Sequence, residues 1–437
     1  MKLPLSTSSL SSNTTPKLST TSSKLKASTK IKSVTKSASN RIYASLSKSR
    51  SRDDKDGDCN DQSSFPFLYT GQPSDQIPRD ITHVRVDPSV KVIAERAFYD
   101  CHLLESIELY QGLVEIQDRA FRNCTSLTYI SIPSTVKSID DSAFRDCHSL
   151  ADVRLCEGLV SIGWGAFSCC KSLTRIEIPD SVEWIGHEAF RDCCQLSTLR
   201  ILEGVQLIKK DAFRNCTSLK RVKIPSSVKI IGEGAFFDCQ QLEYVDLFDG
   251  LEVIQNGAFS NCKSLKLVTV PSTTRVIGTE AFAFCEQLSE VDLWEGLQEI
   301  KSGAFLECIS LQKIWIPSTV KVMEHSAFCY CRRLEAVQLH EGLEEIVDYV
   351  FKGCKSLIRI EVPSSTRAIG YEAFFDCDSL EEVELNEGLE QVGMNAFWNC
   401  RSLQFVKLPS TVEAIVGVKL EGGQMTMPHI IPTLVFM

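Results

Sequence analysis

A motif of 23 residues recurs fourteen times along the chain, with no insertion or deletion between copies. Each copy is marked by a Phe, which follows Ala in thirteen copies and Val350 in one. A fixed period of this length predicts a stack in which each repeat forms one coil around a shared interior. The marker residues are Phe98, Phe121, Phe144, Phe167, Phe190, Phe213, Phe236, Phe259, Phe282, Phe305, Phe328, Phe351, Phe374 and Phe397.

The apolar residues within each copy predict a short strand. Positions nine and eleven after the marker Phe are apolar and their neighbours are mostly polar, as at Ile130 and Ile132. Such alternation is typical of a half-buried strand, and strands of successive coils would stack in parallel about 4.8 Å apart. A second apolar pair follows, as at Val136 and Ile139. The residues around Ala-Phe have room for only a single helical or 3₁₀ turn.

The turns after the predicted strand alternate strictly between two chemistries, so the unit of duplication is 46 residues. Every second copy has Pro-Ser or Pro-Asp, as at Pro133 and Pro179, and the copies between have an acidic residue or Gln before Gly, as at Glu157-Gly158. Pro fixes one backbone angle, whereas Gly permits a positive one. We therefore expect alternate coils to leave the strand through different turns.

The cysteines follow the same period. Fourteen of the 19 lie three residues after a marker Phe, and the others are Cys59, Cys156, Cys169, Cys194 and Cys329. One Cys per coil at one position predicts a buried ladder of small apolar side chains. A second ladder of Phe rings should run beside it. Representative members are Phe190, Cys193, Phe236 and Cys239. So many free thiols favour a reducing compartment.

The chain divides into four segments by composition. Residues 1–52 carry eleven basic residues and no acidic one, and we expect a disordered tail rich in Ser, Thr and Lys. Its composition fits an organelle-targeting segment, a phosphorylated tail or a plain disordered tail. Residues 53–80 are expected to form a linker and an N-terminal cap, 81–416 the solenoid, and 417–437 a C-terminal cap or an irregular tail.

Charge and hydropathy limit the compartment. The net charge of −9 hides a basic tail and an acidic remainder. No apolar run approaches the length of about 18 residues that spans a bilayer, and the first residues lack the apolar segment of a secretory signal. We expect an intracellular protein, in the cytoplasm. Organelle targeting by residues 1–52 and the cell surface are the alternatives.

The order Ala-Phe-x-x-Cys-x-x-Leu-x-x-Ile-x-Leu-Pro-x-x-Val-x-x-Ile resembles the BspA-like subclass of leucine-rich repeats. The resemblance extends over residues 81–416, and Leu127-Thr128-Tyr129-Ile130-Ser131-Ile132 matches the general leucine-rich consensus. It implies a right-handed repeat solenoid of 14 coils, with short parallel strands and helical turns. Members of the family are known mainly as binding or adhesive surfaces, many on microbial cells. A cell-surface adhesin is therefore the alternative to an intracellular scaffold.

No catalytic or metal-binding pattern stands out. The seven His are scattered over different positions of the repeat and never pair with Cys at zinc-ligand spacing. Phosphate-binding loops and nucleophile elbows are missing from the sequence. We expect no enzyme activity, no cofactor, no metal and no small-molecule substrate. The acidic repeats also do not favour nucleic acid as a partner.

The best candidate surface is the solvent side of the predicted strands, eight and ten residues after each marker Phe. These positions differ between copies while the apolar positions stay fixed. Their basic and aromatic residues are typical of protein-binding surfaces, although an ordinary solvated face would also carry such residues. We expect a protein partner that is acidic. The candidate contact residues are Arg154, Arg175, Arg200, Arg221, Lys223, Tyr244 and Trp315.

Overall fold

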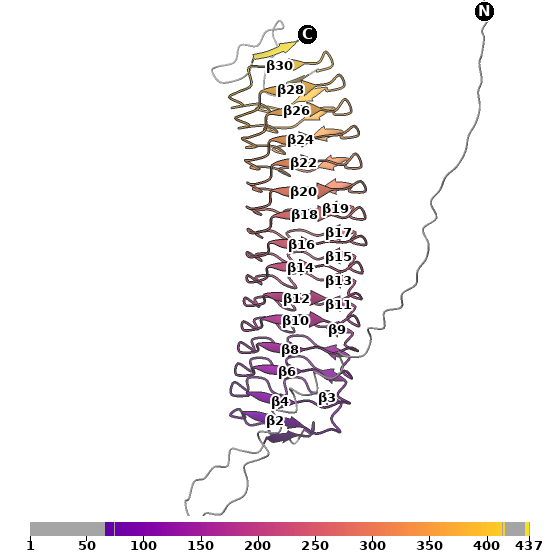
Figure 1. The fold of residues 1–437 in the computed structure, drawn as a ribbon, viewed down its shortest axis with the longest axis vertical. Helices are drawn as coiled ribbons and strands as arrows, with labels where there is room; N and C mark the ends of the chain where they lie inside the picture. Colours follow the sequence, from indigo (N-terminus) through magenta and orange to yellow (C-terminus); the bar gives the residue numbers. More distant parts are fainter. Residues whose placement is uncertain (1–65, 74, 413, 416–432, 437) are drawn as a thin grey trace, which may run out of the picture. The chain divides into compact units, whose positions relative to one another are not determined.

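The computed structural model describes residues 66–73, 75–412, 414–415 and 433–436. The interpretations of residues 1–52, of 53–65 and of 416–432 fall outside these ranges. Every regular element in the described residues is a β-strand, and the strands form two columns that run the length of the solenoid (Figure 1). The described residues contain no helix that could cross a membrane.

The first column consists of the longer strands. They are β1 (Phe67–Tyr69), β2 (His83–Val86), β4 (Ser106–Glu108), β6 (Tyr129–Ser131), β8 (Asp152–Arg154), β10 (Arg175–Ile178), β12 (Thr198–Ile201), β14 (Arg221–Lys223), β16 (Tyr244–Asp246), β18 (Leu267–Val270), β20 (Glu290–Leu293), β22 (Lys313–Trp315), β24 (Ala336–Gln338), β26 (Arg359–Val362), β28 (Glu382–Leu385), β30 (Phe405–Leu408) and β32 (Thr433–Phe436). These strands contain the alternating positions that predicted a strand in each repeat.

The second column consists of two-residue strands. They are β3 (Val92–Ile93), β5 (Glu115–Ile116), β7 (Ser138–Ile139), β9 (Ser161–Ile162), β11 (Trp184–Ile185), β13 (Leu207–Ile208), β15 (Ile230–Ile231), β17 (Val253–Ile254), β19 (Val276–Ile277), β21 (Glu299–Ile300), β23 (Val322–Met323), β25 (Glu345–Ile346), β27 (Ala368–Ile369), β29 (Gln391–Val392) and β31 (Ala414–Ile415). The sequence predicted only an apolar pair, such as Val136 and Ile139, and the second member of each pair lies in one of these strands.

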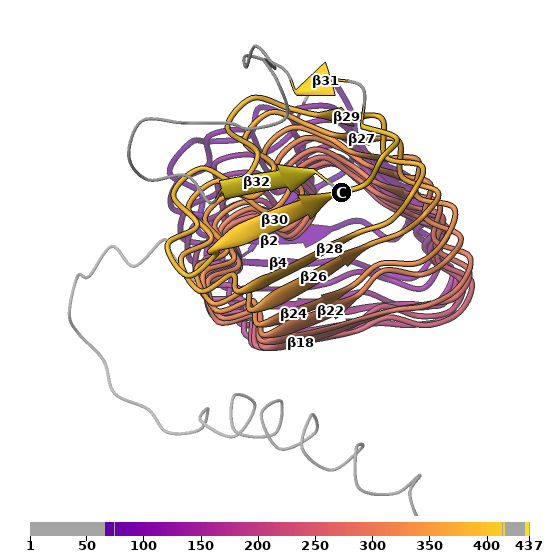
Figure 2. The same cartoon turned by 90° about the horizontal axis from the view of Figure 1, so that it is seen from above.

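All strand pairs are parallel, and the paired residues within the repeats are 23 positions apart, as Val222 and Val245 are. The two-residue strands make one unbroken sheet of 15 strands, whereas the longer strands fall into four sheets. Strands from outside the period lie at both ends: β1 pairs with β2, and β32 pairs with β30. Seen along the stack, the coils superpose, with the two columns on different sides (Figure 2).

The segment around Ala-Phe forms short turns where the sequence predicted a helical turn. Cys124 N–H donates to Phe121 O at 3.2 Å, which closes a single turn. Positive φ angles at Arg119 (54°) and Asn123 (67°) then interrupt any helical run. Phe121 N–H instead donates to Ala143 O of the next coil at 2.7 Å. These bonds hold successive coils together, so no helix forms in the described residues.

The marker rings form one continuous column inside the solenoid. Phe190 and Phe236 are fully buried, and each lies nearly parallel to the Phe of the next coil, at 5.3 Å between ring centroids. Tyr69 of β1 continues the column at its first end, with its ring 5.1 Å from that of Phe98. Because each ring covers its neighbours, the interior is shared by every coil.

The periodic thiols form a second buried column. Cys193 Sγ–H donates to Phe167 O at 3.2 Å and Cys239 Sγ–H to Phe213 O at 3.3 Å, and both cysteines are fully buried. Burial raises the pKa of both thiols well above the usual range. Every cysteine in the part that the structure describes is unpaired, and all except Cys156, Cys169 and Cys194 are buried.

The alternating turns fit together in pairs. In the Gly-type turn, Gly204 N–H donates to Ser227 Oγ of the next, Pro-type coil at 3.1 Å. The same hydroxyl donates to Val205 O at 2.8 Å. The acidic residue Glu203 accepts from Ser226 Oγ at 3.1 Å. Since each Gly-type turn uses a hydroxyl of the following Pro-type turn, the 46-residue period is also a hydrogen-bonded unit.

Candidate binding surface on the strand face

The solvent side of the longer strands, here called the strand face, presents two or three side chains from each coil. Along β10, Arg175 and Glu177 are exposed whereas Ile176 and Ile178 are buried. This alternation follows from the pleat of a strand, which points successive side chains to opposite sides. Positions eight and ten after each marker Phe therefore reach solvent along the whole column, as the sequence predicted.

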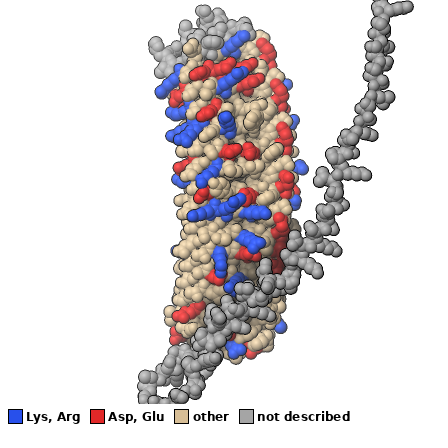
Figure 3. All heavy atoms as spheres, in the orientation of Figure 1, with Lys and Arg blue, Asp and Glu red and all other residues tan. Residues whose placement is uncertain are grey.

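The candidate arginines in β10, β12 and β14 make ion pairs with carboxylates of neighbouring coils. Arg175 Nη2 lies 3.2 Å from Asp152 Oδ2, and Arg200 Nη1 lies 3.1 Å from Glu177 Oε2. Arg221 binds Asp246 through two nitrogens, with its shortest contact at 2.9 Å. The basic candidate residues thus stand among carboxylates on this face, and Figure 3 shows basic and acidic side chains interspersed over this side.

The remaining basic candidates lie against aromatic rings. The Arg154 guanidinium is 5.7 Å from the centroid of Tyr129, and Lys223 Nζ is 5.0 Å from that of Phe248. Arg221 and Lys266 both approach Tyr244, at 6.0 Å and 5.3 Å. Cations placed over aromatic faces gain about 0.5–1 kcal/mol at exposed sites. These contacts order the side chains while leaving them at the surface.

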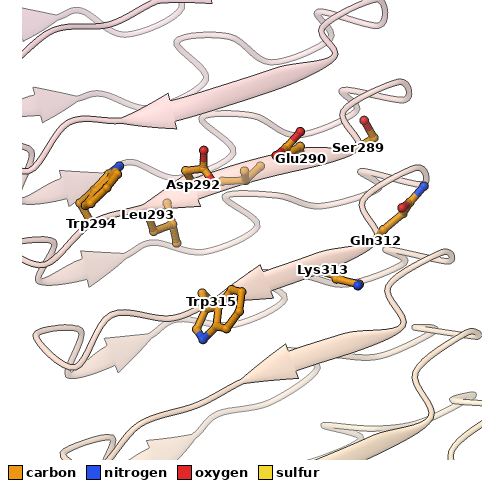
Figure 4. Close-up of a pocket in the computed structure, with 9 residues that line it drawn as sticks. Ser289, Glu290, Asp292, Leu293, Trp294, Gln312, Lys313 and Trp315 are labelled. Atoms are coloured by element: carbon orange, nitrogen blue, oxygen red, sulfur yellow. The ribbon is translucent and has the colours of Figure 1, made fainter.

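The two aromatic candidates occupy different parts of the face. Tyr244 in β16 is 37% exposed and Trp315 in β22 is 60% exposed, with β18 and β20 between their strands. Trp315 borders a depression of about 630 Å³, which Trp294 also lines (Figure 4). The structure therefore does not bring Tyr244 and Trp315 into one cluster.

Trp294, Glu290 and Asp292 also line this depression. Glu290 and Asp292 occupy positions eight and ten of the predicted face but were not among the candidate contact residues, and Trp294 lies outside those positions. Trp294 lies twelve residues after its marker Phe, where Pro-type coils have a buried Pro. Gly-type coils place a variable residue there, such as Phe248 or Trp294, and both of these are exposed. Reading position twelve separately in the two kinds of coil would have found them.

Metal-ligating side chains do not gather in the part of the chain that the structure describes. That part holds no group of three or more His, Cys, Asp or Glu that could bind a metal ion. His148 Nδ1 lies at hydrogen-bond distance from Cys169 O, at 3.0 Å. His325 Nδ1 lies 3.8 Å from Asp348 Oδ2.

Comparisons with known proteins agree with this architecture. The family model described as "BspA type Leucine rich repeat region (6 copies)" matches residues 78–197, 183–312 and 298–418. The chain is similar to a leucine-rich repeat protein from Bacteroides ovatus, with 28% identity, a TM-score of 0.64, and coverage of 76% of this chain and 88% of that one.

Two further solved structures show lower similarity. One is described as a leucine rich cell surface protein from Faecalibacterium prausnitzii, with 27% identity, a TM-score of 0.41 and coverage of 63% of this chain and 86% of that one. The other is a leucine-rich repeat protein from Eubacterium ventriosum, with 20% identity, a TM-score of 0.42 and coverage of 61% and 81%. No curated protein matches the chain.

Proposed function

The chain belongs to the BspA-type leucine-rich repeat family, and from this premise we propose that it is a non-enzymatic scaffold that binds a partner protein through its strand face. The observation that carries the proposal is the contrast between the two sides of each longer strand. The inward residues repeat with little change, whereas the outward residues differ from coil to coil and include exposed Tyr129, Tyr244 and Trp315. Exposed aromatic and Arg side chains are the residues most often found at binding hot spots.

The proposed contact residues are Arg154, Arg175, Arg200, Arg221, Lys223, Tyr244 and Trp315. The ion pairs of the three coil-bridging arginines do not oppose this role. Each pair is exposed, and exposed pairs contribute only about 0–1 kcal/mol. An acidic partner can exchange its own carboxylates for Asp152, Glu177 and Asp246 at small cost, and the ordered guanidiniums then lose little entropy on binding.

Site-specific photo-crosslinking tests the proposal. A benzoylphenylalanine placed at Thr198, which is exposed in β12, should capture a discrete partner from an extract of the native cells. The matched control is Lys321, which is exposed beside β23 in the other column. Replacement of Arg154, Arg175, Arg200 and Arg221 by Gln, or by Glu, should abolish capture of the same partner. Equal capture from Thr198 and Lys321 would contradict a strand-face site.

We propose a reducing, intracellular compartment because the periodic thiols lie unpaired in the core. A disulfide between ladder positions would replace the Sγ–H bonds to the Phe carbonyls. Thiol titration of the denatured native protein should detect about 19 free thiols. Pairing of Cys59, Cys156 or Cys329 would instead favour the second candidate, a cell-surface adhesin.

A further inference from the structure

The depression between β20 and β22 is bordered by two indoles that are unusually open to solvent. Trp294 is 56% exposed and Trp315 is 60% exposed, the two highest values among the exposed large hydrophobic side chains of the described residues. In Figure 4 both indoles lie toward the C-terminal ends of the strands with Asp292 near them, whereas Glu290 lies toward the start of β20, next to Ser289. Two large aromatic side chains on neighbouring coils provide a broad apolar surface for a ligand.

The carboxylates in this depression lack the counter-ions that most carboxylates of the strand face have. Asp152, Glu177 and Asp246 each lie within 4.0 Å of an Arg, and so do Glu108, Glu382 and Glu384. Among the carboxylates of the described strand face, only Glu290, Asp292 and Glu361 have no cation within that distance. Asp292 accepts one weak hydrogen bond, from Thr269 Oγ1 at 3.3 Å.

Other exposed or half-buried aromatic rings of the solenoid already have a cation from the chain itself. Lys209 Nζ is 3.7 Å from the Trp184 ring centroid, and the Arg145 guanidinium is 6.0 Å from that of Trp164. Tyr129, Tyr244 and Phe248 are covered in the same way. Within the described part of the chain, no cation approaches Trp294 or Trp315 to this distance. In the described residues, therefore, neither the rings nor the carboxylates of the depression have a cation within these distances.

The one basic residue in the depression, Lys313, contacts neither its carboxylates nor its indoles within these distances. Lys313 stands opposite Glu290 in the register of β20 and β22. Its ammonium makes no ion pair within 4.0 Å in the described residues. Figure 4 shows it at the Gln312 end of the depression, away from both indoles.

We propose that the Trp294–Trp315 depression binds a basic peptide segment of the partner protein, with an Arg or Lys side chain seated on the indoles, its charge facing Asp292, and Glu290 adding negative charge farther along β20. Trp is the ring that attracts cations most strongly, and a guanidinium combines this attraction with hydrogen bonds to carboxylates. The inference rests on the proposed function and refines it. The depression takes the basic part of a partner, whereas the arginines of β8 to β14 take its acidic part.

Titration calorimetry with the full chain and the synthetic peptide Gly-Arg-Gly-Arg-Gly-Arg-Gly tests the proposal. The control peptide replaces each Arg by citrulline, which keeps the shape but removes the charge. The Arg peptide should bind and the citrulline peptide should not. The fluorine signals of Trp294 and Trp315 in 5-fluorotryptophan-labelled protein, assigned by Trp→Phe variants, should both shift on addition of the Arg peptide.

Variants of the depression should change affinity in opposite directions. Trp294→Ala and Trp315→Ala should each weaken binding of the Arg peptide about three- to thirtyfold, as expected for loss of a cation–π contact. The double variant Glu290→Gln and Asp292→Asn should weaken binding of the Arg peptide and reduce the salt dependence of that binding. Lys313→Ala removes a positive charge that repels the Arg peptide and should strengthen its binding. Trp164→Ala is the matched control, since Trp164 is 41% exposed but lies outside the depression.

Three results would overturn the inference. The first is equal binding of the Arg and citrulline peptides. The second is binding of cellohexaose, a neutral oligosaccharide, that is lost in the Trp294→Ala and Trp315→Ala variants while the Arg peptide fails to bind. The third is no binding of any probe by protein that shows the wild-type melting curve. The proposed function fails separately, since it predicts crosslinking from Thr198 whatever occupies this depression.

Discussion

The ring of Phe236 lies on the ring of Phe259 with their centroids 5.3 Å apart and their planes within 1° of parallel. Phe236 also contacts the coil before it through the ring of Phe213, at 5.2 Å. Each marker ring within the stack therefore contacts the rings of both neighbouring coils. Stability in a repeat protein is roughly a sum of repeat and nearest-neighbour terms, so a change at one ring weakens two interfaces.

Phe236→Ala should destabilise the protein by about 3–5 kcal/mol, because it leaves a large cavity between two coils. Urea unfolding followed by circular dichroism measures the change. Phe237→Ala is the matched control, since Phe237 is the next residue but is only partly buried, beneath the guanidinium of Arg214. A loss below about 1 kcal/mol for Phe236→Ala would show that the ring column is not central to stability.

Gly204→Ala should destabilise more than Gly342→Ala, although both glycines occupy the same turn position. Their φ angles are 128° and 104°, so both substitutions strain the backbone, by about 1–3 kcal/mol. A Cβ on Gly204 would also lie 1.8 Å from the carbonyl oxygen of Asp180, whereas on Gly342 the nearest atom, Ser318 O, is 3.7 Å away. Thermal melts of the two variants isolate this clash. Equal melting temperatures would contradict it.

The protein should lose stability steeply above about pH 9. Burial raises the pKa of Cys285 from 9.0 to about 12, and it raises the pKa of the neighbouring ladder thiols as well. The unfolded chain releases these protons first, so their contribution is complete below the ordinary thiol pKa and is lost as pH rises toward the raised value. In this range each buried thiol lowers the free energy of unfolding by about 1.4 kcal/mol per pH unit.

Urea unfolding at pH 8.0, 9.0 and 10.0 tests this slope. The control is a triple variant, Cys239→Ala, Cys262→Ala and Cys285→Ala, in which the slope above pH 9 should be shallower. Stability that stays level over this range would mean that the thiols are not held in the core.

The Lys352–Glu372 ion pair should matter more than the Arg221–Asp246 pair. The first joins Nζ to Oε2 at 2.6 Å with both side chains largely buried, whereas Arg221 is 66% exposed. Lys352→Ala leaves the largely buried Glu372 carboxylate without its cation, and we expect a cost of about 3 kcal/mol, against less than about 1 kcal/mol for Arg221→Ala. Urea titrations at neutral pH provide the comparison, and equal losses would argue against it.

Acid should remove the contribution of this buried pair. Burial alone would raise the pKa of Glu372, but hydrogen bonds from Lys352 and Tyr371 outweigh it and hold the pKa below its ordinary value. The stabilisation is therefore present above the ordinary Glu pKa and is lost as pH falls through the lowered one. The difference between wild-type and Lys352→Ala stability should shrink from pH 7 to pH 3. A constant difference would indicate that packing of the Lys stem dominates.

The repeat period made most of the fold predictable, because one 23-residue register places every apolar side chain. Val222 and Ile224 alternate with polar residues and were readable as a strand. The pair Ile230–Ile231 was not, since two residues show no alternation. The pairing of β1 with β2 was also hidden, because Phe67 lies 17 residues before Val84 rather than 23.

The candidate site was predictable only in part. Exposure at Arg175 and Trp315 follows from the register, whereas neutralisation of Arg175 by Asp152 depends on side chains that meet across coils. That contact had a signal, since the two residues are 23 positions apart and carry opposite charge. Trp294 was not predicted because position twelve after the marker Phe is exposed to solvent only in Gly-type coils.

The fit between Gly-type and Pro-type turns restricts how such a gene can change its length. Gly204 packs beneath the Pro-type turn of the coil before it and bonds to a hydroxyl of the coil after it. Loss or duplication of a single 23-residue repeat would set two turns of the same kind against each other. Relatives of different length that keep this alternation should therefore differ by whole multiples of 46 residues.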